Sequence, residues 1–243
     1  MRLYELPKNE VCDVIILTNT ADEDIFKMTS SAIESLRESE SNNKFRVILV
    51  ESNPNFDVHK YSADVHLTFN EEFNMNKALN MAFDFIQSDW VYISNNDVLF
   101  CENWYSNLRY NMDVFNLDTA SPKSPIRQFG VSEAAQEFIS KYPDHAVIVG
   151  NEVIVHFAGW GWLTKAETLR LLTPFPEDLK FWYQDNHLSL SLKQMGKKHG
   201  CVTSSYVCHF GQKSYRTIPM EKMFEMTQGI QQNFVKKWLH LRG

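Results

Sequence analysis

The run Trp90-Val91-Tyr92-Ile93-Ser94-Asn95-Asn96-Asp97-Val98-Leu99-Phe100 decides the fold of this chain. Its apolar start predicts a buried strand, which ends abruptly in two amides and a carboxylate before the sequence turns apolar again. Polar groups at the end of a buried strand lie at the mouth of an open α/β sheet, where such folds bind their ligands. Asp97 is then either a ligand of Mg²⁺ or Mn²⁺, which prefer carboxylate oxygens, or part of a turn, which Asn and Asp also favour.

The sequence before this run alternates between strand and helix patterns. Strands are predicted over Val11–Leu17, Phe45–Val50 and Val65–Phe69, and helices over Asp22–Glu38 and Asn74–Gln87. This alternation predicts an α/β fold with a mostly parallel sheet, right-handed crossovers and a ligand crevice at the carboxyl ends of the strands. Thr18 and Glu51 end the first two strands, so we expect them to share that crevice with Asp97.

The sequence after Phe100 is less regular. Helices are expected over Asn103–Phe115, over Ser132–Tyr142, over Lys165–Leu172, from Asp185 to a stop at Gly196, and over Glu221–Leu241, with a last strand over Val202–His209. The prolines and glycine of Asp118–Gly130 predict a loop. Ala146–Val149 and Val153–Phe157 are strand candidates, and Gly150-Asn151 between them predicts a hairpin. We expect the C-terminal helix to pack on the domain or on another subunit.

Composition and charge limit the class of protein. The chain has 243 residues, 44% of them apolar, which suits one domain but is cramped for two. Its net charge of −6 comes from interspersed acids and bases, so the molecule as a whole has no field that attracts a polyanion. The sequence shows no apolar export core and no run near the roughly 18 apolar residues of a membrane span. The scattered cysteines, Cys12, Cys101, Cys201 and Cys208, fit a reducing compartment, so we expect a cytoplasmic location, in the host cytoplasm if the protein is phage-encoded.

Several residues in the second half each have more than one interpretation. Trp160 and Trp162, separated by Gly161, either stack on a sugar face or pack in the core. Asp185, at the start of a predicted helix, is by itself a helix cap. His209 follows the last strand, where a lone imidazole has many structural uses.

The order of these features is more specific than any one of them. Four features follow one another between about residue 11 and residue 216: a strand ending in Asn-Asn-Asp, a Gly-x-Gly, an aromatic-rich Gln-Asp pair opening a helix, and a last strand followed by His and Gly. In this order the sequence resembles the inverting GT-A glycosyltransferases of the large family that includes polysaccharide and rhamnosyl transferases. The resemblance implies a GT-A (Rossmann-like) α/β fold, with a mostly parallel central sheet flanked by helices and a smaller acceptor-side subregion.

The resemblance also implies a role for each matching residue. Asp97 would bind the divalent metal, Mn²⁺ or Mg²⁺, that bridges the donor diphosphate, and His209 would complete the metal site. Asp185 would be the catalytic base that accepts the proton of the acceptor hydroxyl, which gives inversion in a single displacement. Thr18 and Glu51 would contact the donor nucleoside.

Two positions depart from the family pattern. Asn95 replaces the usual first acid of an Asp-x-Asp motif, which lowers the negative charge of the site, and Gln184 replaces the usual Glu before the base, which leaves the base in place. The other candidates are donor contacts from Asn95, Asn96, Lys213 and Arg216, and substrate contacts from Trp160, Gly161, Trp162, Trp182 and Gln184.

A single domain over residues 1–243 follows from this reading, with a nucleotide-sugar half over 1–100, an acceptor and catalytic half over 101–216, and a C-terminal helix over 217–243. The expected donor is a nucleotide sugar, a UDP-sugar first, and the sugar moved is a hexose or a pentose. The acceptor would be a glycan, a lipid-linked sugar, a protein or a hydroxymethylated base of phage-type DNA.

Three alternatives differ from each other in what they need. A nucleotidyltransferase usually has a Gly-rich phosphate loop after the first strand, and Thr18–Asp24 has no glycine. A non-catalytic nucleotide- or sugar-binding module would keep the aromatics and need no base. A DNA-modifying transferase would bind phosphates through local cations and hold a flipped base against aromatic side chains. The aromatics available for this are Trp160, Trp162, Trp182 and Tyr183. The cations are Lys193, Lys197, Lys198, Lys213, Arg216, Lys236 and Lys237.

Overall fold

The computed structural model describes residues 10–41, 44–68, 74–125, 146–153, 156–180, 183–211 and 220–238. Its strands are β1 (Val11–Thr18), β2 (Lys44–Glu51), β3 (Val65–Thr68), β4 (Trp90–Asn95), β5 (Val98–Phe100), β6 (Thr119–Lys123), β7 (Val147–Val149), β8 (Gly161–Lys165) and β9 (His199–His209). Its helices are α1 (Glu23–Glu38), α2 (Met75–Phe83), α3 (Trp104–Phe115), α5 (Ala166–Leu172), α6 (Gln184–Gln194) and α7 (Met220–Trp238), with a short 3-10 helix, η1 (Val58–Lys60). The predicted helix Ser132–Tyr142 lies outside the described residues.

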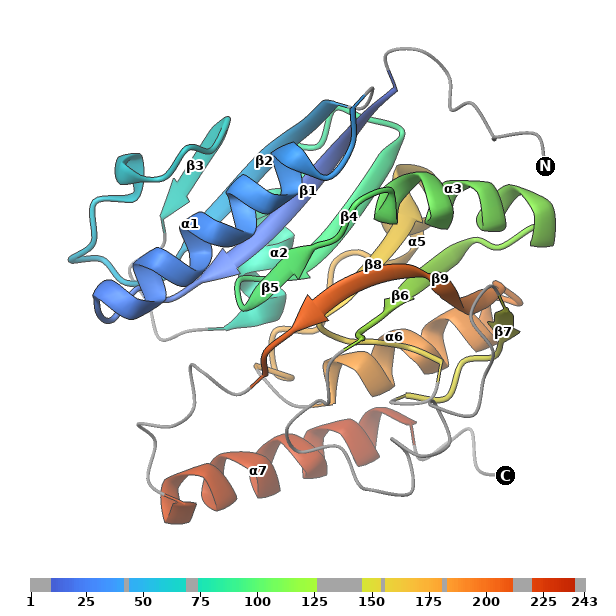
Figure 1. Cartoon of the computed structure of the whole chain (residues 1–243). Helices are drawn as coiled ribbons and strands as arrows, with labels where there is room; N and C mark the ends of the chain where they lie inside the picture. Colours follow the sequence, from blue (N-terminus) through green and yellow to red (C-terminus); the bar gives the residue numbers. More distant parts are fainter. Residues whose placement is uncertain are drawn as a thin grey trace.

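The strands form one sheet in the order β3-β2-β1-β4-β8-β6-β9-β5, and β7 pairs with β9 outside this row. The half that contains β3, β2, β1 and β4 is parallel, and β8 joins it antiparallel to β4 (Figure 1). Thr18 pairs with Glu51, and Leu17 pairs with Asn95, so three neighbouring strands end at one edge. The predicted α/β class, a largely parallel sheet flanked by helices, is confirmed.

Helices cover both faces of the sheet, as the two hydrophobic clusters show. The first cluster joins Cys12, Val14 and Ile16 of β1 to apolar residues of α1 and α3. The second joins Ile15 and Leu17 of β1 to apolar residues of α2, α5 and α6. A strand buried on both faces reads as a continuous apolar run, which is why β1 was recognisable in the sequence.

The first two long helices begin at side-chain caps that the sequence marks. Asp22 Oδ1 accepts the backbone N–H of Ile25 at 2.9 Å, and Asn74 Oδ1 accepts the backbone N–H of Lys77 at 3.1 Å. Such caps satisfy N–H groups that have no partner inside the helix. Both predicted helix starts are confirmed.

The prediction of a loop over Asp118–Gly130 is wrong for its first part, because Thr119–Lys123 forms β6. Proline lacks an N–H for a strand ladder and is confined to bulges and edges of sheets. Pro122 meets this condition, since the ladder to β8 covers only Thr119 and Ala120, and the register with β9 shifts between Pro122 and Lys123.

The predicted hairpin around Gly150-Asn151 is also wrong. β7 pairs antiparallel with β9, and the Gly150 N–H donates to the carbonyl of His199 at 3.0 Å. After it the chain turns, because the backbone N–H groups of His156 and Phe157 both donate to the carbonyl of Glu152. A distant strand therefore replaces the local partner that the turn signal suggested.

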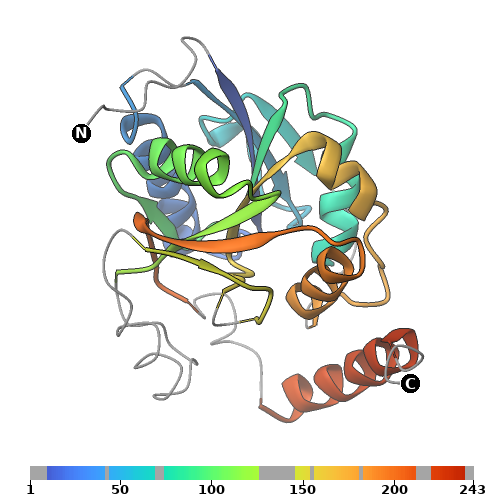
Figure 2. The same cartoon turned by 90° about the vertical axis from the view of Figure 1, so that its right-hand side faces the viewer.

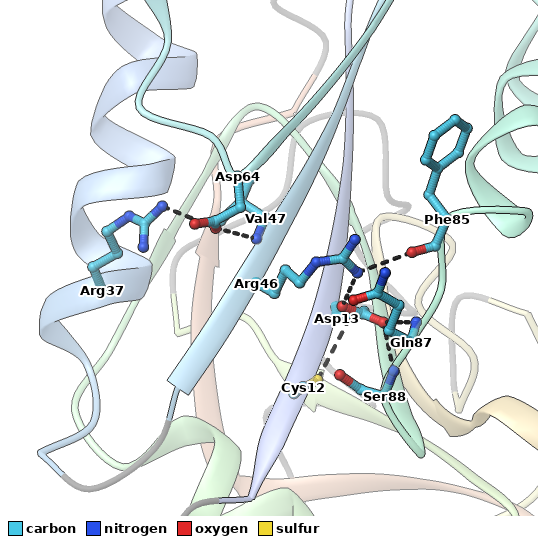
Figure 3. A network of polar contacts seen from close by, with 9 residues as sticks. All are labelled: Cys12, Asp13, Arg37, Arg46, Val47, Asp64, Phe85, Gln87 and Ser88. Carbon is cyan, nitrogen blue, oxygen red and sulfur yellow. Dashed lines mark hydrogen bonds and ion pairs between the residues drawn. The ribbon is translucent and has the colours of Figure 1, made fainter.

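A buried carboxylate holds the starting ends of the parallel strands, away from the edge where Thr18 and Asn95 lie. Asp13 is 0% exposed; its Oδ1 pairs with Arg46 Nη1 at 2.8 Å, and its Oδ2 accepts the N–H groups of Gln87 and Ser88 at 2.7 and 2.8 Å (Figure 3). These three contacts, which replace the water that a buried carboxylate loses, come from β2 and the turn before β4. Asp13 thus ties three neighbouring segments together.

The C-terminal helix α7 packs on the domain, beside α6 (Figures 1 and 2). Its residue Ile230 is buried, whereas Phe224 on the same helix is 64% exposed. Among the described helices, none combines the length and the apolar character needed to cross a membrane.

Candidate functional site

Asp97 and His209 meet at the strand end that the sequence singled out. β5 leaves the turn after Asp97 and pairs antiparallel with β9, which places Val98 opposite His209. The backbone N–H of Phe210 donates to the carbonyl of Asp97 at 2.9 Å. As a result, Asp97 Oδ1 lies 3.3 Å from His209 Nε2, with both side chains almost entirely buried.

This pair fits a divalent metal by its chemistry and spacing. Asp97 Oδ1 is buried and has no hydrogen-bond partner among the described residues, and the His209 nitrogen that faces it is Nε2. The other ring nitrogen, Nδ1, is also buried without a partner there. Ligand atoms that bind one ion at about 2.0–2.2 Å lie roughly 3.0–3.5 Å from each other. The described part of the chain contains no group of three or more His, Cys, Asp or Glu side chains that could hold an ion. The pair would therefore supply two ligands and leave the others to water and substrate oxygens, as Mg²⁺ sites commonly do.

Trp160 and Asn95 flank the pair. The Trp160 ring stacks on the His209 ring, with centroids 5.0 Å apart and planes 12° apart. Asn95 Nδ2 lies 3.5 Å from His209 Nε2, and the Asn95 backbone N–H donates to the carbonyl of Trp160 at 2.9 Å. The imidazole orientation is thus set by an aromatic face on one side and β4 on the other.

Asp185 lies in the first turn of α6, against the backbone that precedes Trp160. A Cβ placed on Gly159 would be 3.0 Å from Asp185 Cβ and 3.3 Å from Asp185 Oδ2. Only glycine allows this approach without a shift of the carboxylate. Asp185 Oδ1 accepts the N–H of Asn186 at 2.9 Å. Burial outweighs this hydrogen bond and raises the pKa of Asp185 above its ordinary value of 3.8.

The residue that opens α6 has an unusual backbone. Tyr183 has φ 65°, in the left-handed region that side chains rarely adopt, and no side-chain cap follows it. Gln184, next to it, is buried and donates from Nε2 to the carbonyl of Lys180 at 3.2 Å. Gln184 therefore links the first turn of α6 to Lys180.

A row of hydroxyls connects the end of β1 to the Asn-Asn-Asp turn. Thr18 Oγ1 lies 3.3 Å from the hydroxyls of Thr20 and Thr29. Asn96 Nδ2 donates to Thr18 Oγ1 at 3.1 Å and to Thr29 Oγ1 at 3.0 Å. These contacts bury Thr18 and Asn96 and hold the turn that carries Asp97 against α1.

Glu51 ends β2 beside this row and has one satisfied and one unsatisfied oxygen. Its Oε1 accepts the backbone N–H groups of Thr20 and Asn53 at 3.1 and 2.7 Å. Its Oε2 is buried with no partner among the described residues, although Glu51 is 0% exposed. A buried carboxylate oxygen without a donor is costly, so this atom suits a ligand that brings a hydrogen-bond donor.

Tyr61, in the segment after η1, lies beside Thr20 and Glu51 at the end of β2. Its hydroxyl lies 2.6 Å from Thr20 Oγ1, and burial raises the pKa of Tyr61 above its ordinary value of 10.0. The phenol therefore keeps its proton at neutral pH.

The contacts bring most of the candidate residues together in one continuous group. From Glu51 and Thr18 it passes through Asn96 to Asp97, and from there through His209 and Trp160 to Gly159 and Asp185. Gly161 and Trp162 lie apart from this group in β8: a Cβ on Gly161 would collide with Tyr92 Oη, and Trp162 is 1% exposed and packs on Phe157. Lys213, Arg216 and Trp182 lie outside the described residues.

Sequence reasoning did not single out several residues that complete this group. Thr20, Thr29 and Tyr61 are separated along the chain and meet only through tertiary contacts. Gly159 is the first glycine of the Gly-x-Gly in the motif order, but its close contact with Asp185 was not predicted. Tyr183 gives no signal of its left-handed conformation.

Comparisons with known proteins bear on the fold. No family model matches the sequence, and no curated protein matches it either. Among solved structures, the chain is similar to GalNAc-T7 in a crystal structure with UDP, GalNAc and Mn²⁺, with a TM-score of 0.64 and 12% sequence identity. The alignment covers 86% of this chain and 45% of that chain, so this chain spans less than half of GalNAc-T7. At this identity the likeness concerns the fold and not the inverting family that the motifs resemble. The chain therefore has a GT-A-like fold.

Proposed function

We propose that this chain is an inverting glycosyltransferase that moves a sugar from a nucleoside diphosphate sugar to an acceptor hydroxyl in one metal-assisted displacement. One observation carries the proposal: the Asp97–His209 pair and the Asp185 carboxylate are linked by two consecutive residues, Gly159 and Trp160. A metal-binding pair and a carboxylate held apart from it suit a reaction in which the leaving group and the nucleophile occupy different sides of one carbon.

The two ends of this arrangement would do different work. Asp97 and His209 would hold a divalent ion, which when bound would supply Lewis-acid stabilisation to the departing diphosphate. The mixed oxygen and imidazole donors favour Mn²⁺ over Mg²⁺. Asp185 accepts the proton from the attacking hydroxyl. Burial raises its pKa above the ordinary value, which makes the carboxylate a better base than an exposed aspartate.

Glu51 would recognise the nucleoside of the donor. Its unpartnered Oε2 accepts a hydrogen bond from a base N–H or a ribose hydroxyl, and both groups are present in a UDP-sugar. Thr20 and Tyr61 border the same corner. Asn95 and Asn96 would support this donor side through the turn, and Lys213 and Arg216 would add charge to the phosphates. Trp160 and Gln184 border the base, whereas Trp182 keeps its proposed substrate contact from the sequence alone.

The acceptor class is proposed more broadly, as a glycan, a lipid-linked sugar, a protein or modified DNA. Two of the cations considered for DNA are already paired: Lys197 with Asp118 at 2.8 Å and Lys237 with Asp178 at 3.2 Å. These pairs weaken the electrostatic argument for DNA. Binding to DNA that disappears with salt would favour that acceptor, and no binding at low salt would remove it.

The test measures release of the nucleoside diphosphate from a panel of nucleotide sugars with Mn²⁺ in the wild type and in Asp185→Asn. We expect one donor to be turned over, and Asp185→Asn to lower the rate by about 100-fold or more while donor affinity stays the same. Asp89→Asn is the control, because Asp89 is an exposed carboxylate at the opposite end of β4. Full activity in Asp185→Asn would show that Asp185 is not the catalytic base. Donor binding without any turnover in the wild type would favour a non-catalytic binding module.

A further inference from the structure

The backbone of Tyr183 requires an explanation that α6 itself does not supply. Its φ of 65° is rarely adopted by residues with a side chain, and such a conformation persists only where the surroundings impose it. The carbonyl of Tyr183 accepts the N–H of His187 at 2.8 Å, so the first turn of the helix is built on this residue. Asp185 belongs to the same turn. Whatever fixes Tyr183 therefore fixes where Asp185 points.

The α7 helix contacts the first turn of α6 at two levels. The Phe234 ring stacks on the Tyr183 ring, with centroids 5.0 Å apart and planes 24° apart. One helical turn further along both helices, Trp238 Nε1 donates to His187 Nδ1 at 3.1 Å. Because residues four apart lie on one face of a helix, these contacts join one face of α7 to one face of the α6 start. Figures 1 and 2 both show α7 running beside α6.

His187 suits this contact chemically. Burial is the largest cause that lowers its pKa, from 6.5 to about 4, so the imidazole is neutral at neutral pH. A neutral ring has one nitrogen that accepts, and Nδ1 is the nitrogen that faces the indole N–H of Trp238.

The segment before Tyr183 is held from two sides. On the α7 side, Lys237 Nζ pairs with Asp178 Oδ1 at 3.2 Å, and Asn233 Nδ2 donates to the carbonyl of Asp178 at 3.4 Å. On the α2 side, Asn76 Nδ2 donates to the carbonyls of Pro176 and Leu179 at 2.7 and 3.2 Å. Residues 176–179, shortly before Tyr183, are therefore fixed against both α7 and α2.

We propose that α7 is the positioning element of the catalytic site: the Phe234 ring holds Tyr183 in its left-handed conformation, and Trp238 holds the turn that follows, so that Asp185 stays against Gly159. This inference rests on the proposed function for the role of Asp185 as base. Phe234, Trp238 and Tyr183 are positioning residues that act through Asp185, and none of them needs to touch the substrate.

Phe234→Ala tests the proposal through two independent measurements. The first is turnover: kcat should fall about tenfold or more, because small displacements of a catalytic group are costly, while KM for the donor changes less than about twofold. The second is the pKa of the Asp185 carboxyl, followed by carbon NMR. It should fall towards 3.8 as the loosened turn admits water.

A glycine at position 183 distinguishes loss of the left-handed conformation from a general loss of structure in Phe234→Ala. Glycine adopts positive φ without help, so Tyr183→Gly added to Phe234→Ala should recover a large part of kcat. Phe224→Ala is the matched control, because Phe224 is a 64% exposed phenylalanine on the same helix. It should change neither kcat nor the Asp185 pKa. If Phe234→Ala does not fold, Phe234→Leu, which keeps apolar contact but not the ring, takes its place.

The outcomes distinguish this inference from the proposed function. An Asp185 pKa that is the same in Phe234→Ala as in the wild type overturns the positioning role, and so does a loss of kcat that glycine at position 183 does not restore. If the wild type turns over no donor while the Asp185 pKa still moves in Phe234→Ala, the positioning role stands and the proposed function fails.

Discussion

His209 Nε2 lies 3.3 Å from Asp97 Oδ1, and the antiparallel pairing of β5 with β9 creates this relationship. Because Val98 pairs with His209, the residue before β5 and the last residue of β9 are brought to the same point. The buried, unpartnered Asp97 Oδ1 then faces Nε2 of the largely buried His209 side chain at the edge of the sheet. The arrangement is built into the backbone ladder and does not depend on a flexible loop.

Removing either partner should weaken Mn²⁺ binding. We expect Asp97→Asn and His209→Gln each to lower the affinity for Mn²⁺ by about tenfold or more, because each removes one of the two proposed protein ligands. Electron paramagnetic resonance of free Mn²⁺ measures the affinity of each variant for the ion without any enzyme assay. Trp160→Phe, which keeps an aromatic face on the imidazole, should keep most of the affinity. Equal Mn²⁺ binding by wild type and Asp97→Asn would place the metal elsewhere.

Asp185→Asn should make the protein more stable at pH 7 while it removes the proposed base. Burial raises the pKa of Asp185 in the folded state above 3.8, so the folded protein binds this proton more readily than the unfolded chain. The ionised carboxylate therefore costs stability above its folded pKa, and the neutral amide does not carry this cost. Urea unfolding at pH 7 and at pH 3 checks the sign, since the gain should be present at pH 7 and shrink at pH 3. A loss of stability at pH 7 would show that the carboxylate is needed by the fold.

Asp13→Ala should destabilise the fold strongly without touching the candidate site. The substitution leaves Arg46 and the N–H groups of Gln87 and Ser88 without their buried partner (Figure 3). Breaking such a buried pair costs roughly 3–5 kcal/mol. Arg37→Ala is the comparison, because it removes the partly exposed pair with Asp64, which contributes about 0–1 kcal/mol. Similar free energies of unfolding for the two variants would contradict the central role of Asp13.

The buried His199 should make the fold sensitive to acid. Burial lowers its pKa from 6.5 to about 3, and the neutral ring contacts Thr119 Oγ1 through Nδ1 at 2.7 Å and the carbonyl of His156 through Nε2 at 3.0 Å. Between these pKa values the unfolded chain binds a proton that the folded protein does not. Stability is therefore complete above about pH 6.5 and falls as the pH drops towards 3.

Urea unfolding at several pH values would measure this effect. His199→Gln should flatten the decline between pH 6.5 and pH 4, whereas His59→Gln, at an exposed position, should leave it unchanged. An unchanged slope in His199→Gln would assign the acid sensitivity to other groups.

The sequence predicted the parallel half of the fold because its signals there are local. Val11–Thr18 and Trp90–Asn95 are apolar runs that end in polar residues, and Asp22 and Asn74 cap the helices that they precede. Each of these features depends on a few neighbouring residues. Right-handed crossovers then leave little choice of topology.

The antiparallel half was harder because its pairing is decided by distant residues. β6 contains Pro122 and becomes a strand only through β8 and β9. β7 was expected to pair with its neighbour in sequence and pairs with β9 instead. β8 begins at Gly161, inside a segment read for its tryptophans and not for a strand.

The candidate site likewise contains residues that local sequence patterns predicted and features that depend on distant contacts. Asp97, Asp185 and His209 were named from motif order, and the contacts through Gly159 and Trp160 show that they are neighbours. The left-handed Tyr183 could not be predicted, because its conformation depends on a stacking partner on α7. Roles that depend on tertiary contact are thus the part that sequence patterns omit.

The most direct test of the central claim is titration calorimetry of UDP into the wild type and into Asp97→Asn, each with and without Mn²⁺. The account predicts that the wild type binds UDP much more tightly with Mn²⁺ than without it, and that Asp97→Asn loses this difference while it stays folded. UDP binding that is the same in both proteins and independent of Mn²⁺, or no binding of any nucleoside diphosphate by the folded wild type, would contradict a metal-assisted donor site at Asp97 and His209.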